Sequence, residues 1–147
     1  MLPSERFKLI LSVYIILIKD GKTLLLRRAN TGFEDGNYGL VSGHADGNET
    51  ARNAVCREAF EESGLELKPA EVRFVHLMHR IGADERVDVF FTADKWPSTP
   101  FNKEPDKCDD LSWFPLDNLP SNTIPYIRQA LKCYQNKVHY SEYGWDK

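Results

Sequence analysis

Residues 43–65, GHADGNETARNAVCREAFEESGL, constrain the fold of this chain more than any other segment. We expect a helix that begins near Asn48 or Glu49, because Asn48 can cap free backbone N–H groups and Glu49 suits the positive end of the helix dipole. Gly64 is a typical C-terminal stop, since glycine readily adopts the left-handed conformation that ends many helices. The segment is therefore predicted to be a loop followed by one helix.

Three carboxylates of this helix share one face. At about 100° per residue, Glu58, Glu61 and Glu62 fall within an arc of roughly 100°. One turn upstream the same arc carries small apolar residues, Ala51, Ala54 and Val55. A solvated face would be polar along its whole length, so something is expected to pack against this side. Partly buried like charges repel one another unless a cation lies among them, and hard oxygen ligands favour Mg²⁺ or Mn²⁺ over zinc.

The spacing of this stretch resembles the signature of the Nudix hydrolase family. That signature is a glycine, five residues, a glutamate, seven residues, Arg-Glu, an aliphatic residue, any residue, Glu-Glu, any residue, a glycine and an aliphatic residue. The matching residues are Gly43, Glu49, Arg57, Glu58, Ala59, Glu61, Glu62, Gly64 and Leu65. The resemblance implies an α/β (α+β) fold, the family's α/β/α sandwich with a central mixed sheet, and a hydrolase that uses Mg²⁺, with Mn²⁺ as a substitute.

The resemblance also implies roles for individual residues. Glu58, Glu61 and Glu62 are metal ligands, and the main-chain carbonyl of Gly43 joins them. One carboxylate can also serve as the base for the attacking water, and Glu61 is counted among the catalytic residues. Arg57, four residues before Glu61, is counted with it because it can hold that carboxylate in position. Outside this motif, an exposed helix arginine would be the default interpretation.

Arg28 and His44 are candidate substrate contacts close to the motif. Arg28 ends a predicted strand just before a loop, so it is either a phosphate contact or an ordinary strand-end charge. His44 follows Gly43 directly and either faces the substrate or is a loop histidine without a function. Ser42 stands where the family usually has a further glycine, and it can narrow the loop near the metal or the substrate.

Two residues farther along the chain are assigned to the site by resemblance alone. Segment 101–114, FNKEPDKCDDLSWF, resembles a region of MutT-type members in which a glutamate approaches the metals, which makes Glu104 the third catalytic candidate. The alternative is a surface carboxylate loosely paired with Lys103 or Lys107. Asn122 lies where MutT-type members place a base-reading asparagine, and it is equally suited to cap the helix that follows.

The remaining elements follow from hydrophobic periodicity. Strands are predicted over residues 7–19, 22–28, 38–42, 71–81, 86–93 and 111–114, and a second helix over residues 124–137. Strand 7–19 is apolar on both faces, so we expect it in the interior of a sheet. Asp20-Gly21 predicts a tight hairpin turn. Segment 94–108 is predicted to be a long functional loop, and the polar-aromatic tail 140–147 is left without an assignment.

Composition limits the possible partners and compartments. The 147 residues fit a single domain over 1–147, and a net charge of −3 offers no broad basic surface for a nucleic-acid polymer. Three cysteines without a CxxC pair indicate reduced thiols. The apolar run 9–18 is too short to span a bilayer, and segment 2–5 has no signal-peptide form, which favours a cytoplasmic protein. A monomer and a homodimer are both compatible with the sequence.

We therefore predict Mg²⁺-dependent hydrolysis of a nucleoside di- or triphosphate, with water attack on the phosphoanhydride and release of a nucleoside monophosphate. The first alternative keeps this chemistry but takes a nucleotide sugar, ADP-ribose or another nucleoside diphosphate linked to a group X. The second alternative is a nucleotide-binding module without turnover, which the intact set of glutamates disfavours. The sequence leaves the base, the number of phosphates and the identity of the general base open.

Overall fold

The computed structural model describes residues 6–146, so segment 2–5, whose lack of a signal-peptide form was noted above, lies outside the described residues. The elements in chain order are β1 (Ile10–Ile16), β2 (Ile18–Lys19), β3 (Lys22–Arg28), β4 (Tyr38–Gly39), β5 (Val41–His44), α1 (Ala51–Ser63), the 3-10 helix η2 (Pro69–Glu71), β6 (Val72–Ile81), β7 (Glu85–Ala93), β8 (Cys108–Pro115), α2 (Pro125–Gln135) and β9 (Tyr140–Tyr143). No helix within residues 6–146 is both long enough and apolar enough to cross a bilayer.

The larger of two sheets is mixed and has the strand order β5-β1-β7-β6-β9. β1 runs parallel to β7 and β9 runs parallel to β6, whereas the other neighbours are antiparallel. Val13 on β1 lies opposite Gly43 on one side and opposite Val89 on the other. The predicted interior position of this strand is therefore confirmed, and Gly43 is held beside the best-buried strand of the sheet.

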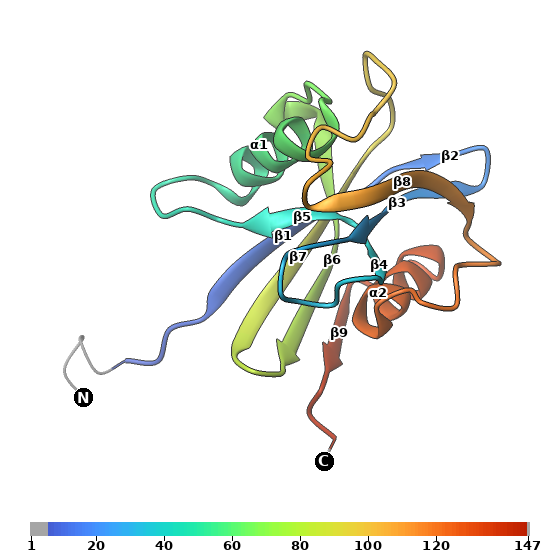
Figure 1. Ribbon diagram of the computed structural model, residues 1–147. Helices are drawn as coiled ribbons and strands as arrows, with labels where there is room; N and C mark the ends of the chain where they lie inside the picture. The colour runs from blue at the N-terminus through green and yellow to red at the C-terminus, as the bar shows by residue number, and fades with distance from the viewer. Residues whose placement is uncertain (1–5, 147) are drawn as a thin grey trace.

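Different helices cover the two faces of the larger sheet, as Figure 1 shows. Val13 and Ile15 of β1 are buried in a core that also contains three residues of α1, Ala54, Val55 and Ala59. Tyr14 and Ile16 are buried in a second core with four residues of α2, Tyr126, Ile127, Ala130 and Leu131. Successive side chains of a strand point to opposite faces, so one apolar run supplies both cores. The predicted α/β/α layers and the mixed sheet are confirmed.

A smaller second sheet was not predicted from the sequence. In it β3 pairs with β2, β4 and β8. The prediction of one strand over 7–19 is wrong, because β1 ends at Ile16 and a separate strand, Ile18–Lys19, pairs with β3 instead. An apolar run shows that a strand is buried but not where it changes partner. The hairpin turn is confirmed, since Asp20 and Gly21 have φ angles of 53° and 74°.

Helix α1 begins two residues later than predicted. Thr50 is its N-cap and accepts a hydrogen bond at Oγ1 from the backbone N–H of Asn53, 3.0 Å away. Asn48 instead adopts a left-handed conformation, with φ of 65°, and Glu49 lies outside the first turn. The C-terminal stop at Gly64 is confirmed, with φ of 72°. A Cβ atom at Gly64 would also collide with the ring of Phe101, which lies directly against this glycine.

The C-terminal part of the chain returns to the larger sheet. Tail residues 140–143 form β9, which pairs with β6, so the tail that the sequence left unassigned is an edge strand. The buried ring of His76 on β6 holds this return, because its nitrogens lie 2.7 Å from Val138 O and 2.7 Å from Ser141 Oγ. The N-cap of α2 is Ile124, without a side-chain hydrogen bond, so the alternative in which Asn122 caps this helix is wrong.

Candidate active site

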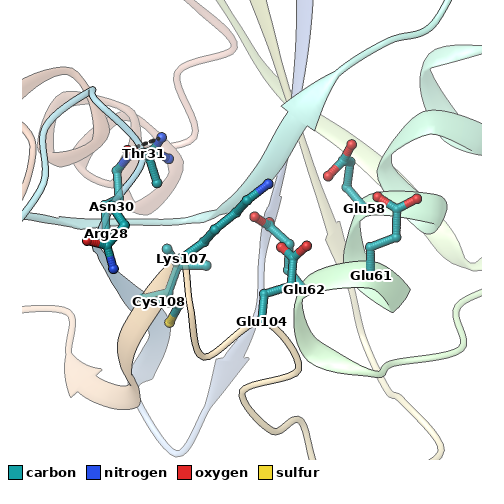
Figure 2. A pocket seen from close by; sticks show the side chains of 10 residues that line it. Arg28, Asn30, Thr31, Glu58, Glu61, Glu62, Glu104, Lys107 and Cys108 are labelled. Atoms are coloured by element: carbon teal, nitrogen blue, oxygen red, sulfur yellow. Dashed lines mark hydrogen bonds between the residues drawn. The ribbon is translucent and has the colours of Figure 1, made fainter.

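Four glutamates from two distant segments line one cavity of about 390 Å³. Glu58, Glu61 and Glu62 come from the C-terminal half of α1, and Glu104 comes from the loop before β8. The rest of the lining is Leu26, Arg28, Asn30, Thr31, Lys107 and Cys108. Figure 2 shows the glutamates on one side of the cavity and Arg28, Asn30 and Thr31 on the other. The predicted carboxylate face of α1, formed by Glu58, Glu61 and Glu62 and called the carboxylate wall below, thus faces an open space and not a packed core.

Gly43 leaves room for the carboxyl group of Glu58. A Cβ atom at residue 43 would collide with this carboxyl group in its present position, so glycine allows the side chain of Glu58 to lie against β5. The strand therefore forms a cradle for that carboxylate, and the backbone of Gly43 lies beside it. Burial raises the pKa of Glu58, and the charges of Glu61 and Glu104 act in the same direction, whereas Arg57 lowers it.

Glu62 is the glutamate most affected by its surroundings. Its Oε1 accepts a hydrogen bond from the backbone N–H of Ser42 at 2.7 Å, which fixes the side chain between α1 and β5. Burial raises the pKa of Glu62 to about 8, with further contributions from the charges of Glu58 and Glu104. The Ser42 N–H and the charge of Arg28 only partly oppose this shift. A cation placed among these oxygens would relieve the repulsion.

Arg57 joins the loop before α1 to the carboxylate wall. Its guanidinium donates at 2.7 Å to Glu49 and at 2.7 Å to Glu58, and at 3.1 Å to the carbonyl oxygen of His44. The expected contact with Glu61 is present but longer, at 3.4 Å. Hydrogen bonding to Glu49 is the largest of the effects that raise the pKa of Arg57. Glu49 also accepts from the N–H of Asp46 at 2.7 Å, so its role is to shape the loop.

Glu104 reaches the cavity because its loop is fixed to α1. The backbone N–H of Phe101 donates to Ser63 O at 3.0 Å, and that of Lys103 donates to Glu62 O at 3.3 Å. The carbonyl of Glu104 then accepts from the N–H groups of Lys107 and Cys108 at 2.9 and 3.0 Å, which closes a tight turn. The structure thus places Glu104 in the cavity of the three helix glutamates, and its charge contributes to the raised pKa of Glu62.

Arg28 borders a second cavity as well as the first. This space of about 220 Å³ is lined by Ser12, Tyr14, Arg28, Phe33, Ser42, Gly43, His44, Glu62, Arg86 and Tyr126. Arg28 donates through Nε to Phe33 O at 2.7 Å and through Nη2 to Thr31 Oγ1 at 3.1 Å. His44 lies at the other side of this cavity, with Nε2 3.2 Å from Nη1 of Arg86. The two cavities meet at Arg28 and Glu62.

Asn122 lines neither cavity. Its side-chain amide donates to the carbonyl oxygen of Gly36 at 2.7 Å, and its own carbonyl accepts from the N–H of Tyr38 at 2.9 Å. These bonds hold the end of loop 29–37, the loop that carries Phe33 into the second cavity. The structure brings together all the other residues predicted for the site except Arg57, which contacts two of the glutamates from outside the lining.

The sequence interpretation missed several lining residues, among them Phe33, Arg86 and Lys107. Phe33 lies in a polar loop in which no periodicity marks it. Arg86 belongs to β7, which reaches the site only because β7 pairs with β1. The sequence did contain a signal for Lys107. It lies three residues after Glu104, and residues at this spacing share a face of a tight turn. It was considered only as a partner of Glu104.

The donor atoms suit a hard divalent cation. Carboxylate oxygens dominate the wall, soft ligands are absent from it apart from Cys108, and the thiol of Cys108 points to Asp110 O at 3.2 Å. Within residues 6–146 no three acidic, imidazole or thiol groups already form a closed metal-binding set. Mg²⁺ is commonly held by one or two carboxylates together with water and substrate phosphates, so an open set fits this ion.

Comparison with known proteins agrees with this geometry. Residues 8–134 match the model of the NUDIX domain. A MutT NUDIX hydrolase from Burkholderia pseudomallei has a similar structure, with a TM-score of 0.78 and 30% identity over 86% of this chain and 98% of that one. The oxidized purine nucleoside triphosphate hydrolase of Mus musculus is 30% identical over 108 residues, 72% of this chain and 67% of that protein.

The NAD-capped RNA hydrolase NudC of Stutzerimonas stutzeri is 26% identical over 134 residues, which are 82% of this chain but only 41% of that protein. The chain therefore spans less than half the length of that relative. The NUDIX match, by contrast, covers most of the chain and includes every residue predicted for the site. With the glycine cradle and the carboxylate wall in place, the chain belongs to the NUDIX domain family and is a Nudix hydrolase.

Proposed function

We propose that this protein is a Mg²⁺-dependent pyrophosphohydrolase of nucleoside di- or triphosphates. Water attacks a phosphoanhydride of the substrate, and a nucleoside monophosphate is released. The observation that carries the proposal is the single cavity in which four glutamates face Arg28 and Lys107. The similarity to a mouse hydrolase of oxidized purine nucleoside triphosphates supports a nucleotide substrate.

The position of each residue in or beside the cavity indicates its role in hydrolysis. Glu58, Glu61, Glu62 and the carbonyl of Gly43 would hold the metal, which when bound neutralises phosphate oxygens and lowers the pKa of a bound water. Arg57 keeps Glu58 and Glu61 in place through its bonds of 2.7 and 3.4 Å. Glu61 is the most exposed of the three helix carboxylates in the cavity and Glu104 lines the same cavity, so either can take the proton of the attacking water.

The second cavity would hold the part of the substrate beyond the phosphates. Arg28 lies between the cavities and would contact a phosphate, while His44 faces the second cavity from β5. Phe33 offers an exposed ring to a nucleobase. Asn122 would act on base choice by fixing loop 29–37 or by reaching the base itself. Asn122→Ala should therefore change the ranking of nucleotides by kcat/KM, by about 1–3 kcal/mol.

Hydrolysis of a nucleotide sugar, ADP-ribose or another diphosphate linked to X is the second candidate. The polar lining of the second cavity favours it, because Ser12, His44 and Arg86 offer hydrogen bonds to a sugar or to a second charged group. A binding module without turnover is disfavoured by the complete set of glutamates. We further propose a single NUDIX domain that acts in the cytoplasm as a monomer or homodimer, on small nucleotide-like molecules and without a nucleic-acid polymer or a membrane as partner.

A release assay distinguishes the candidate substrates and tests whether the protein is a hydrolase. Release of nucleoside monophosphate, together with phosphate or pyrophosphate, should be measured with Mg²⁺ across normal and oxidised nucleoside di- and triphosphates, nucleotide sugars, ADP-ribose and dinucleoside polyphosphates. We expect the largest kcat/KM with a nucleoside di- or triphosphate. A preference for an X-linked diphosphate would select the second candidate. Absence of release from every compound, by a folded protein that still binds nucleotides, would contradict hydrolysis.

A further inference from the structure

The loop between β7 and β8 carries a lysine that the assigned roles leave unused. Residues 101–108 cross from α1 to the end of β3, and backbone hydrogen bonds hold both ends. At the α1 end, Phe101 and Lys103 donate to Ser63 and Glu62, as described above. At the β3 end, the N–H of Ala29 donates to Lys107 O at 3.0 Å, and the side chain of Asn30 donates to Asp106 O at 3.0 Å. The backbone of Lys107 is thus fixed at the edge of the cavity.

The two lysines of segment 101–108 point in different directions. Lys103 turns outward, and its ammonium lies 3.4 Å from the centre of the Phe60 ring on α1. Lys107 turns inward and lines the cavity with the four glutamates. In Figure 2 its side chain extends across the cavity toward the carboxylate wall. A lysine that only served solubility would not need to point at this space.

Lys107 is not neutralised by the carboxylates it faces. None of the ion pairs among residues 6–146 includes Lys107. Arg57 compensates part of the negative charge instead, since it forms ion pairs with Glu49, Glu58 and Glu61. The nitrogens of Arg28 are also partly used by Phe33 O and Thr31. Among the described residues Lys107 therefore keeps its three ammonium donors available for a ligand, whereas two donors of Arg28 are already used.

The charges of the cavity indicate what that ligand is. The lining carries four carboxylates against the two cations Arg28 and Lys107, so a divalent cation would bring it close to neutral. A diphosphate bound to that cation still has oxygens that face away from the glutamates. An ammonium on a flexible stem can follow such oxygens as a point charge. Charge-assisted hydrogen bonds of this kind are stronger than neutral ones.

We propose that Lys107 binds the substrate's diphosphate through the oxygens that the metal and the glutamates leave free, and that this contact is made already in the bound ground state. This inference rests on the proposed hydrolysis of a phosphoanhydride. It gives the loop after β7 two roles, because Glu104 would face the metal and Lys107 would bind the phosphates. Removal of the lysine should weaken binding more than it slows the chemical step.

The test compares Lys107→Gln with Lys107→Arg and with Lys103→Gln, the matched control on the same loop. Affinity for methylenediphosphonate and for the α,β-methylene analogue of ADP is measured by calorimetry at saturating Mg²⁺, and melting temperature reports on folding. For Lys107→Gln we expect a roughly tenfold or greater loss of affinity for both probes, by the same factor, and a similar rise in KM with kcat within about threefold. Lys107→Arg should recover most of this loss, and Lys103→Gln should bind as the wild type does.

Other outcomes separate this inference from the proposed function. Wild-type affinity in Lys107→Gln, or an equal loss in Lys103→Gln, would overturn the phosphate contact even in an active hydrolase. A fall in kcat with unchanged affinity for both probes would also overturn it, since the lysine would then act only in the transition state. If the wild type hydrolyses nothing but binds methylenediphosphonate in a Lys107-dependent way, the contact stands and the hydrolase proposal fails.

Discussion

Two clusters of charge in this molecule are built in opposite ways. On the inner part of the larger sheet, Arg80 donates to the fully buried carboxylate of Asp88 at 2.6 Å, and Tyr14 donates to the same group at 2.9 Å. The guanidinium of Arg80 also lies 3.7 Å from the centre of the Tyr126 ring. In the cavity beside α1, by contrast, four carboxylates face only partial compensation from Arg57, Arg28 and Lys107.

The difference shows that the protein itself compensates the charges of the first cluster, whereas a ligand must compensate the charges of the second. A buried ion pair is tolerated only when hydrogen bonds satisfy both partners, and the Arg80–Asp88 pair meets that condition. The glutamate wall does not, as the raised pKa of Glu62 indicates. The first cluster therefore contributes to folding and the second to binding. Each of the following predictions tests that division, in order of decreasing effect.

The largest effect is expected on stability, from Asp88→Ala. It leaves the Arg80 charge buried and unpaired, which costs about 3–5 kcal/mol. Urea denaturation measures this loss. Asp94→Ala is the control, because Asp94 pairs with Arg73 at 3.2 Å on the surface and such pairs contribute under about 1 kcal/mol. Equal losses in the two variants would remove the distinction between the buried pair and ordinary surface charges.

Glu62→Gln should have the opposite profile, with lost activity and a preserved fold. Removal of one metal-facing charge weakens both metal binding and water activation, so we expect turnover to fall at least ~100-fold. Glu61→Gln is expected to do the same. Steady-state kinetics at saturating Mg²⁺ measures the effect, and Glu66→Gln, which changes an exposed glutamate just beyond α1, is the control. Near-wild-type turnover would contradict the metal assignment.

Mg²⁺ should stabilise the free protein through the open cluster only. A ligand specific for the folded state adds about 2.7 kcal/mol at a concentration of one hundred times its Kd. Thermal melting in chelator and in Mg²⁺ measures this increment, and Mn²⁺ should act similarly. Replacing Glu58 and Glu62 together by Gln should abolish the increment, whereas Asp94→Ala should keep it. Identical melting with and without metal would contradict a carboxylate site in the free protein.

The smallest effect is expected for Glu104→Gln. Its carboxylate enters the cavity from a loop and not from the helix, so we expect kcat to fall about tenfold, less than the roughly 10²–10⁴-fold that the loss of a sole general base would cost. The melting temperature should not change, because the backbone bonds that fix the loop are retained. A kcat within about twofold of the wild type across pH 7–9 would reduce Glu104 to a loop charge.

The elements predicted best are those that depend on near neighbours in the chain. The hairpin at Asp20 and Gly21 and the helix end at Gly64 each require a backbone conformation that these residues favour. The start of α1 was misplaced because Asn48, Glu49 and Thr50 are all acceptable near a helix N-terminus. The hydrogen bond from the Asn53 N–H to Thr50 makes Thr50 the N-cap, and N-cap propensities do not predict which of the three residues forms this bond.

Pairing between strands that are distant in the sequence was beyond reach of the sequence. Nothing local distinguishes Ile16 from Ile18, although they belong to different sheets. The tail strand β9 lacks an apolar pattern, because it is short and lies at an edge. It forms because its backbone pairs with β6 and because the ring of His76 is hydrogen-bonded to Val138 O and Ser141 Oγ. Such pairings depend on residues more than sixty positions apart, and no window along the chain contains both partners.

The sequence by itself determined the family motif and the carboxylate face of α1. These features follow from helix geometry and from residue types at fixed spacing, so they can be derived without knowledge of the rest of the chain. Tertiary structure alone decided which residues oppose that face. Lys107, Arg28 and Arg86 meet the glutamates or their neighbouring cavity because a loop, β3 and β7 converge there. Charge compensation acts through space, and distance in space is fixed only when the chain has folded.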